Sequence, residues 1–201
     1  MASIHVLWRR IDAPGRDACR IRLDFRGARL LGHSEFVEDG QPFRLRYAVS
    51  TDARLRTTRA VVEGYAGTQP VRLDIRRSAE GRWTLAEVEQ QDVFGCEDVD
   101  LAFTPATNLL PLRRLRLAIG QAAPSPAAYL ELASSRLTLL PQFYKRLSRG
   151  TYRYEAPTFG YGGTLWVSRL GVVLRYPGLF EAQAVSEHHA RSGRTDYSPS
   201  Q

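Results

Sequence analysis

The sequence predicts a single domain built mainly of antiparallel β-sheet. Three observations support this prediction: a length of 201 residues, alternating apolar and polar residues along most of the chain, and turn signals rather than amphipathic helices between the alternating runs. A chain of this length can bury one sizeable hydrophobic core. Strands that follow one another through short turns pair antiparallel, so parallel strands with crossover helices are not expected.

The expected strands are the runs in which apolar and polar residues alternate with a period of two. They are residues 3–9, 18–26, 43–50, 57–63, 71–77, 83–89, 128–132, 142–147, 151–155, 165–170, 172–176 and 179–184. Turn signals such as Asp39-Gly40 and Glu80-Gly81 separate neighbouring runs, as they do in hairpins. We expect residues 1–186 to form the domain. Residues 187–201 are polar and lack periodicity, which predicts a flexible C-terminal tail.

One segment, residues 104–115, departs from the strand pattern and predicts a single short helix. With Asn108 as N-cap, Pro111 falls in the first helical turn, where its missing N–H is tolerated. Leu109, Leu112 and Leu115 then line one face at helical spacing.

The net charge of +7 comes from arginines, since Lys145 is the only lysine among 28 basic residues. Most of these arginines alternate with apolar residues, which predicts that they lie on the solvent face of half-buried strands. The residues concerned include Arg20, Arg22, Arg44, Arg46, Arg72 and Arg76. Binding to an anionic surface or a nucleic acid through this face stays open as an alternative function.

The chain offers no recognisable catalytic, metal or cofactor motif. Its four histidines and its two cysteines, Cys19 and Cys96, show no paired-ligand spacing, and Cys19 is in phase with apolar strand residues. No apolar run approaches the roughly 20 residues that cross a bilayer, and the N-terminus does not resemble a secretory signal. We therefore expect a cytoplasmic protein that does not insert into membranes and needs no metal or cofactor.

The most polar cluster of the sequence surrounds the predicted helix. Glu97, Asp98 and Asp100 precede it, and Arg113 and Arg114 lie within it. Alternation places the two aspartates on one strand face, where paired carboxylates can act in acid–base catalysis. Alternatively they form a structural clamp, because a buried arginine needs a partner. The clamp predicts a carboxylate of Asp98 or Asp100 within about 4 Å of Arg113 or Arg114.

The segment from Gly95 to Leu115, GCEDVDLAFTPATNLLPLRRL, resembles the signature of the putative glycolipid-binding family. Further matches follow in order along the chain, at Trp8-Arg9, residues 46–49, 54–57 and 152–155, and Tyr176 to Phe180. The sequence departs from the family pattern at Leu109, where a small polar residue is usual, and at Phe180, where tryptophan is usual. The resemblance implies a spiral β-roll, a long antiparallel sheet wrapped around a single short helix, and a glycolipid-like ligand.

We therefore expect a non-catalytic protein that binds an apolar or amphiphilic, glycolipid-like small molecule in a cavity between curved sheet and helix. A strongly curved sheet has a concave apolar face that one short helix need not fill. An enzyme that uses Asp98 and Asp100 as an acid–base pair remains the principal alternative. The expected ligand-binding residues are Asp98, Asp100, Thr104, Thr107, Asn108, Arg113 and Arg114.

Overall fold

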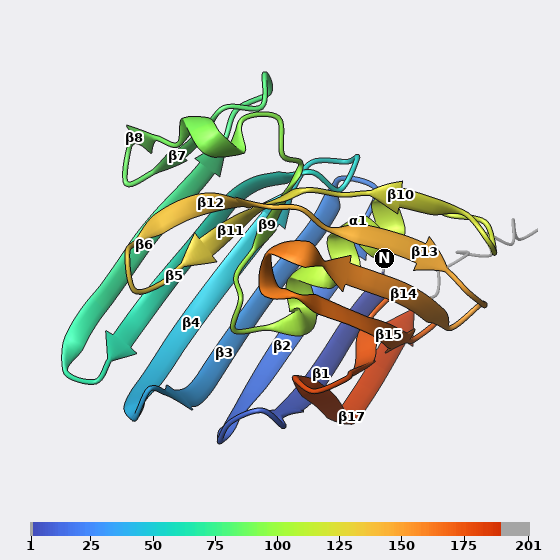
Figure 1. Ribbon diagram of the computed structural model, residues 1–201, viewed down its shortest axis with the longest axis horizontal. Helices are drawn as coiled ribbons and strands as arrows, with labels where there is room; N and C mark the ends of the chain where they lie inside the picture. Colours follow the sequence, from blue (N-terminus) through green and yellow to red (C-terminus); the bar gives the residue numbers. More distant parts are fainter. Residues whose placement is uncertain (1, 190–201) are drawn as a thin grey trace, which may run out of the picture.

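The computed structural model describes residues 2–189, and 60% of the structure is β-strand. A long sheet of 14 strands forms most of the molecule, in the order β10-β13-β14-β15-β16-β17-β1-β2-β3-β4-β5-β6-β7-β8. All of its strand pairs are antiparallel, and the sheet curves so that its two halves face each other (Figure 1). The predicted mainly β fold, a curved β-roll, is confirmed.

The N-terminal half of the long sheet consists of long hairpins. Its strands are β1 (Ala2–Arg10), β2 (Gly15–Asp24), β3 (Gly27–Glu38), β4 (Gln41–Thr51), β5 (Thr57–Ala66), β6 (Gln69–Arg77), β7 (Trp83–Leu85) and β8 (Val88–Glu89). The C-terminal half has shorter strands, β10 (Ala122–Pro124), β13 (Phe143–Arg146), β14 (Thr151–Ala156), β15 (Tyr161–Val167), β16 (Val173–Tyr176) and β17 (Phe180–His189). Pairing of β1 with β17 joins the halves.

A separate sheet of three strands lies beside the curved sheet. It has the order β12 (Arg136–Leu140), β11 (Ala127–Glu131) and β9 (Asp98–Asp100). β9 runs parallel to β11, which is the exception to antiparallel pairing.

The helix α1 (Leu109–Arg114) lies inside the roll and follows directly on the 3-10 turn η2 (Pro105–Asn108) (Figure 1). It falls within the segment predicted to be helical, and Leu109 and Leu112 are buried as expected, whereas Leu115 is the C-cap residue and is only partly buried. Two further 3-10 turns are η1 (Gln91–Val93) and η3 (Pro157–Phe159). Burial of Leu109, Leu110 and Leu112 against the inner sheet face holds this short helix in place, because six residues form too few backbone hydrogen bonds to be stable alone.

Alternation along the strands separates the core from the solvent face as predicted. In β2 the pattern is strict, with Cys19, Ile21 and Leu23 buried and the intervening Arg20 and Arg22 exposed. The other four arginines expected on the outer face, Arg44, Arg46, Arg72 and Arg76, are also exposed.

The structure corrects the sequence interpretation in several places. β3 was not expected, because Gly32 and the pair Leu30-Leu31 obscure its alternation. The expected strand 83–89 is instead a hairpin of β7 and β8, with positive φ at Ala86 and Glu87 in the turn. β10 and β12 were also not expected, whereas β9 is the strand expected to carry Asp98 and Asp100.

Two expected features of the element ends also differ from the structure. Asn108 occupies the N-cap position of α1 as expected, but its backbone is helical and its side chain makes no capping hydrogen bond, because η2 already begins three residues earlier. β17 continues to His189, so residues 187–189 of the expected tail belong to the sheet. The rest of that tail, residues 190–201, lies outside the described residues.

Candidate functional site

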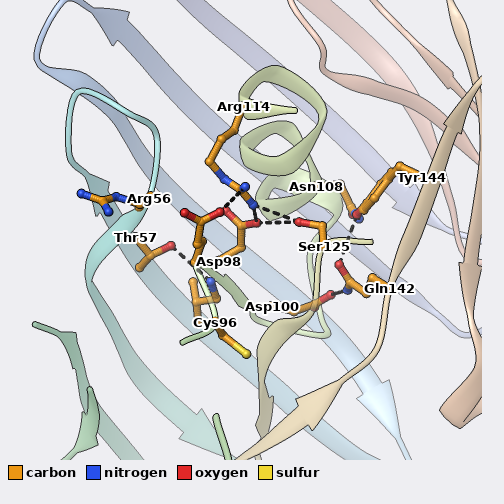
Figure 2. Close-up of polar contacts among 12 residues, drawn as sticks. Arg56, Thr57, Cys96, Asp98, Asp100, Asn108, Arg114, Ser125, Gln142 and Tyr144 are labelled. Atoms are coloured by element: carbon orange, nitrogen blue, oxygen red, sulfur yellow. Dashed lines mark hydrogen bonds and ion pairs between the residues drawn. The ribbon is translucent and has the colours of Figure 1, made fainter. Parts of the chain in front are cut away.

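Arg114, at the C-terminal end of α1, is clamped by two carboxylates (Figure 2). One guanidinium nitrogen bonds Asp98 and the other bonds Glu97. Ser125 completes the cluster, since its hydroxyl accepts from Arg114 at 2.9 Å and donates to Asp98 at 3.1 Å. The predicted contact between Asp98 and Arg114 is confirmed.

The clamp ties the helix to β9 and to the loop before β11. Asp98 is buried, and burial raises its pKa to about 6 although Arg114 and Ser125 act in the opposite direction. At neutral pH the carboxylate is therefore charged and its charge is compensated by Arg114. This arrangement is typical of a structural ion pair.

Asp100, two residues further along β9, has different partners. Its carboxylate accepts a hydrogen bond from Gln142 Nε2 at 2.6 Å and another from the backbone N–H of Ala102 at 2.9 Å. Burial raises its pKa, and these two hydrogen bonds act against that increase. The two aspartates thus belong to separate networks, and only Asp98 pairs with an arginine.

A chain of side-chain hydrogen bonds leads from Asp100 back to the start of α1 (Figure 2). Tyr144 donates from its hydroxyl to Gln142 Oε1 at 3.3 Å, and Asn108 Nδ2 donates to the Tyr144 hydroxyl at 2.9 Å. Asn108, Gln142 and Tyr144 are all buried, so each amide and hydroxyl group needs such a partner. The chain fixes the position of Asp100 relative to the helix.

A second buried network, not predicted from the sequence, surrounds Asp17 of β2. The Tyr47 hydroxyl donates to Asp17 Oδ2 at 2.9 Å, and the Thr104 hydroxyl donates to the same oxygen at 2.6 Å. Burial raises the pKa of Asp17 to about 7 despite both hydrogen bonds. A signal was present in the sequence, since Asp17 is in phase with Cys19 and the other inward-facing residues of its strand.

A pocket of about 680 Å³ opens beyond these networks, between the β3–β4 hairpin, the β11–β12 turn and the C-terminal strands of the roll. Its wall is rich in aromatic rings, with Phe43, Phe103, Tyr129, Tyr154, Phe159, Tyr161, Tyr176 and Phe180 among the lining residues. Several rings contact one another: Tyr129 and Phe159 have centroids 5.1 Å apart, and Tyr154 and Tyr176 have centroids 5.6 Å apart. We call this cavity the aromatic pocket.

Of the seven residues expected to bind a ligand, Asp100, Thr104 and Asn108 line the aromatic pocket. Asp98 and Arg114 form the clamp, and Thr107 is buried. Arg113 donates to the backbone oxygen of Leu170 at 2.9 Å. Sequence reasoning therefore placed part of the pocket floor but missed the aromatic walls, which come from strands distant in sequence.

A second hollow, of about 720 Å³, lies on the outer face of the sheet. All of its lining residues belong to neighbouring strands of one sheet, including Leu7, Leu31 and Val61. A molecule bound there would be covered from one side only, whereas the aromatic pocket draws its walls from both sheets. Because ligand sites usually bury most of the ligand surface, the aromatic pocket is the stronger candidate site.

The part of the chain that the structure describes contains neither a metal-binding cluster nor a membrane-spanning helix. Residues 2–189 contain no group of three or more His, Cys, Asp or Glu side chains placed to hold a metal ion. Within the same range, no helix is long and apolar enough to cross a membrane.

The fold and the pocket define a class of protein, a curved antiparallel β-roll with an aromatic cavity beside the short helix α1. The model of the family described as "Putative glycolipid-binding" matches residues 5–182, so the chain belongs to this family. A crystal structure of a DUF1089 family protein from Pseudomonas aeruginosa is similar, with a TM-score of 0.74 and 29% identity. The similarity covers 83% of this chain and 91% of that one. No curated protein matches the chain.

Proposed function

We propose that the protein binds an amphiphilic, glycolipid-like molecule in the aromatic pocket and catalyses no reaction on it. The observation that carries the proposal is the pocket itself, in which many aromatic rings surround a few polar groups. Binding sites for small molecules have this composition, because apolar walls supply affinity and a few polar groups orient the ligand. The volume of about 680 Å³ lies within the range of such sites. Membership of the family agrees with a glycolipid-like ligand.

The pocket can accommodate an amphiphile with its apolar part against the aromatic rings. Phe103, Leu130 and Leu140 are buried lining residues at the inner end, whereas Glu38, Asp39 and Ser134 are exposed lining residues at the mouth. An apolar chain would therefore point inward and the polar group would remain near solvent. This orientation avoids burying an unpaired polar group of the ligand.

Native mass spectrometry of the freshly purified protein tests this proposal, because a bound amphiphile would be detected as a mass adduct. Displacement of the neutral dye Nile red gives a second readout. We expect Ala133→Trp, which places a large ring at the exposed mouth of the pocket, to reduce dye binding severalfold. Ala79→Trp, in an exposed turn remote from the lining residues, is the matched control. Equal dye binding by both variants would contradict the proposal.

An enzyme is the second candidate function, and one observation favours it. Asp100 lines the aromatic pocket, has no arginine partner within residues 2–189 and has a raised pKa, as a general acid or base often does. The clamp argues against Asp98 and Asp100 as a catalytic pair, because Asp98 is bound to Arg114 and does not line the pocket. Both oxygens of Asp100 also accept hydrogen bonds from the protein. Chemical change of the amphiphile on incubation with wild-type protein, lost in Asp100→Asn, would support the enzyme.

A further inference from the structure

The aromatic pocket carries a charge opposite to that of the whole protein. The chain has a net charge of +7, yet the charged residues within 2–189 that line the pocket are Glu38, Asp39, Asp100, Glu131 and one cation, Arg10. A pocket of one sign of charge attracts ligands of the other sign and repels those of its own.

The Arg10 cation is already neutralised. Arg10 donates two hydrogen bonds to Asp12, at 3.1 and 2.6 Å. Its guanidinium also lies over two rings, 4.9 Å from the Phe36 centroid and 5.7 Å from the Phe180 centroid. Such a paired and stacked arginine has little capacity left for an anionic ligand.

The carboxylates occupy two levels of the pocket. Glu38 and Asp39, from the tip of the β3–β4 hairpin, and Glu131, at the end of β11, are exposed and belong to the mouth. Asp100 lies at the inner end beside the hydrogen-bond chain to α1. A ligand therefore meets three exposed carboxylates at the mouth and one further carboxyl group at the inner end.

Burial raises the pKa of the tyrosines in the wall, and the carboxylates of the pocket add to this increase. Burial raises the pKa of Tyr129 to about 12, and the charges of Asp100, Glu38 and Glu131 add to the increase, while Arg10 opposes it weakly. Burial also raises the pKa of Tyr154 and of Tyr176, and the charge of Asp100 contributes to both.

Aromatic faces near the mouth provide a second feature suited to a cation. Phe159 is 56% exposed and its ring centroid lies 5.1 Å from that of Tyr129. The electron-rich faces of such rings attract ammonium groups, and desolvation strengthens the attraction. Carboxylates and rings together form the usual recognition surface for an organic cation.

We propose that the pocket selects amphiphiles whose polar group is a positively charged amine, and that it rejects those with a phosphate, sulfate or carboxylate group. This inference rests on the proposed binding function and narrows the glycolipid-like ligand to one whose polar group carries a positively charged amine. The amine would lie between the mouth carboxylates and the Tyr129–Phe159 pair, with the apolar chain along the inner aromatic wall.

Three probes with the same dodecyl chain test the selectivity: dodecylammonium, dodecyl maltoside and dodecyl phosphate. Each competes with Nile red at neutral pH, low salt and concentrations below micelle formation. We expect dodecylammonium to bind at least about tenfold more tightly than dodecyl phosphate, with the maltoside between them. Equal affinities, or a preference for the phosphate, would overturn the inference. Failure of all three probes to displace the dye would instead count against the proposed binding function.

A charge-matched pair of triple variants assigns the selectivity to the pocket. Glu38→Gln/Asp39→Asn/Glu131→Gln removes three exposed carboxylates of the mouth, and Asp39→Asn suits the positive φ of 49° at that position. Glu80→Gln/Glu89→Gln/Asp92→Asn removes three exposed carboxylates elsewhere and changes the net charge equally. We expect the ammonium-to-phosphate affinity ratio to fall to near one in the first variant and to stay at the wild-type value in the second. An unchanged ratio in the first variant, or an equal fall in both, would refute the assignment.

Discussion

Substitution of Asp98 by alanine should destabilise the fold strongly, because it leaves a largely buried arginine without its buried partner. The Arg114 side chain is 14% exposed and that of Asp98 is 3% exposed, whereas that of Glu97 is 40% exposed. Removing one partner of a buried ion pair costs about 3–5 kcal/mol. Since Arg114 retains Glu97 and some solvent, we expect the lower end, about 3 kcal/mol.

The same structure supplies a matched control. Glu97→Gln removes the exposed partner of the same guanidinium, and an exposed ion pair contributes only about 0–1 kcal/mol. For a domain of this size, about 3 kcal/mol corresponds to a decrease in Tm of roughly 6–12 °C. Urea titration and calorimetry of both variants measure the difference. The reasoning is refuted if Asp98→Ala costs no more than Glu97→Gln.

Three further predictions concern other parts of the molecule. Burial raises the pKa of Asp17 from 3.8 to about 7 in the folded protein. The protonated Asp17 side chain therefore stabilises the folded state fully at pH values below 3.8, and this stabilisation is lost as the pH rises through about 7. Urea titrations should therefore show that this contribution to the free energy of unfolding decreases between pH 4 and 7. Asp17→Asn should weaken the pH dependence of the free energy of unfolding over this range, and an unchanged pH dependence would contradict the raised pKa of the buried carboxyl group. Gly32→Ala should cost about 1–3 kcal/mol in urea titrations, because its Cβ would lie 2.0 Å from Cζ of Tyr47; a neutral effect would show that the ring moves freely. Random duplex DNA should bind weakly and be released by modest salt in a fluorescence-anisotropy titration, because the exposed arginines are spread over the outer face; sequence-selective binding at physiological salt would favour the nucleic-acid alternative.

Short-range patterns gave correct predictions wherever neighbouring residues decide the structure. Strict alternation in β2 identified which side chains face the core, because a period of two assigns successive residues to opposite faces. Asp39-Gly40 forms a hairpin turn as expected, since both residues adopt the positive φ that such turns require, although the strand before it, β3, was not expected. The clamp between Asp98 and Arg114 was also predictable, because both residues lie in one short segment and a buried arginine requires a partner.

Only the tertiary structure decided the composition of the pocket and the second buried network. Asp17 and Thr104 are 87 residues apart, and their contact depends on how far the sheet curves before it meets the segment leading into η2. The pocket depends on the same curvature, which brings Phe159 of the C-terminal half beside Tyr129 of the separate sheet and places Glu38 at the mouth. Alternation specifies the face on which a side chain lies but not what that face meets. Curvature is a sum of many small twists between strands, and no local pattern of residues encodes that sum.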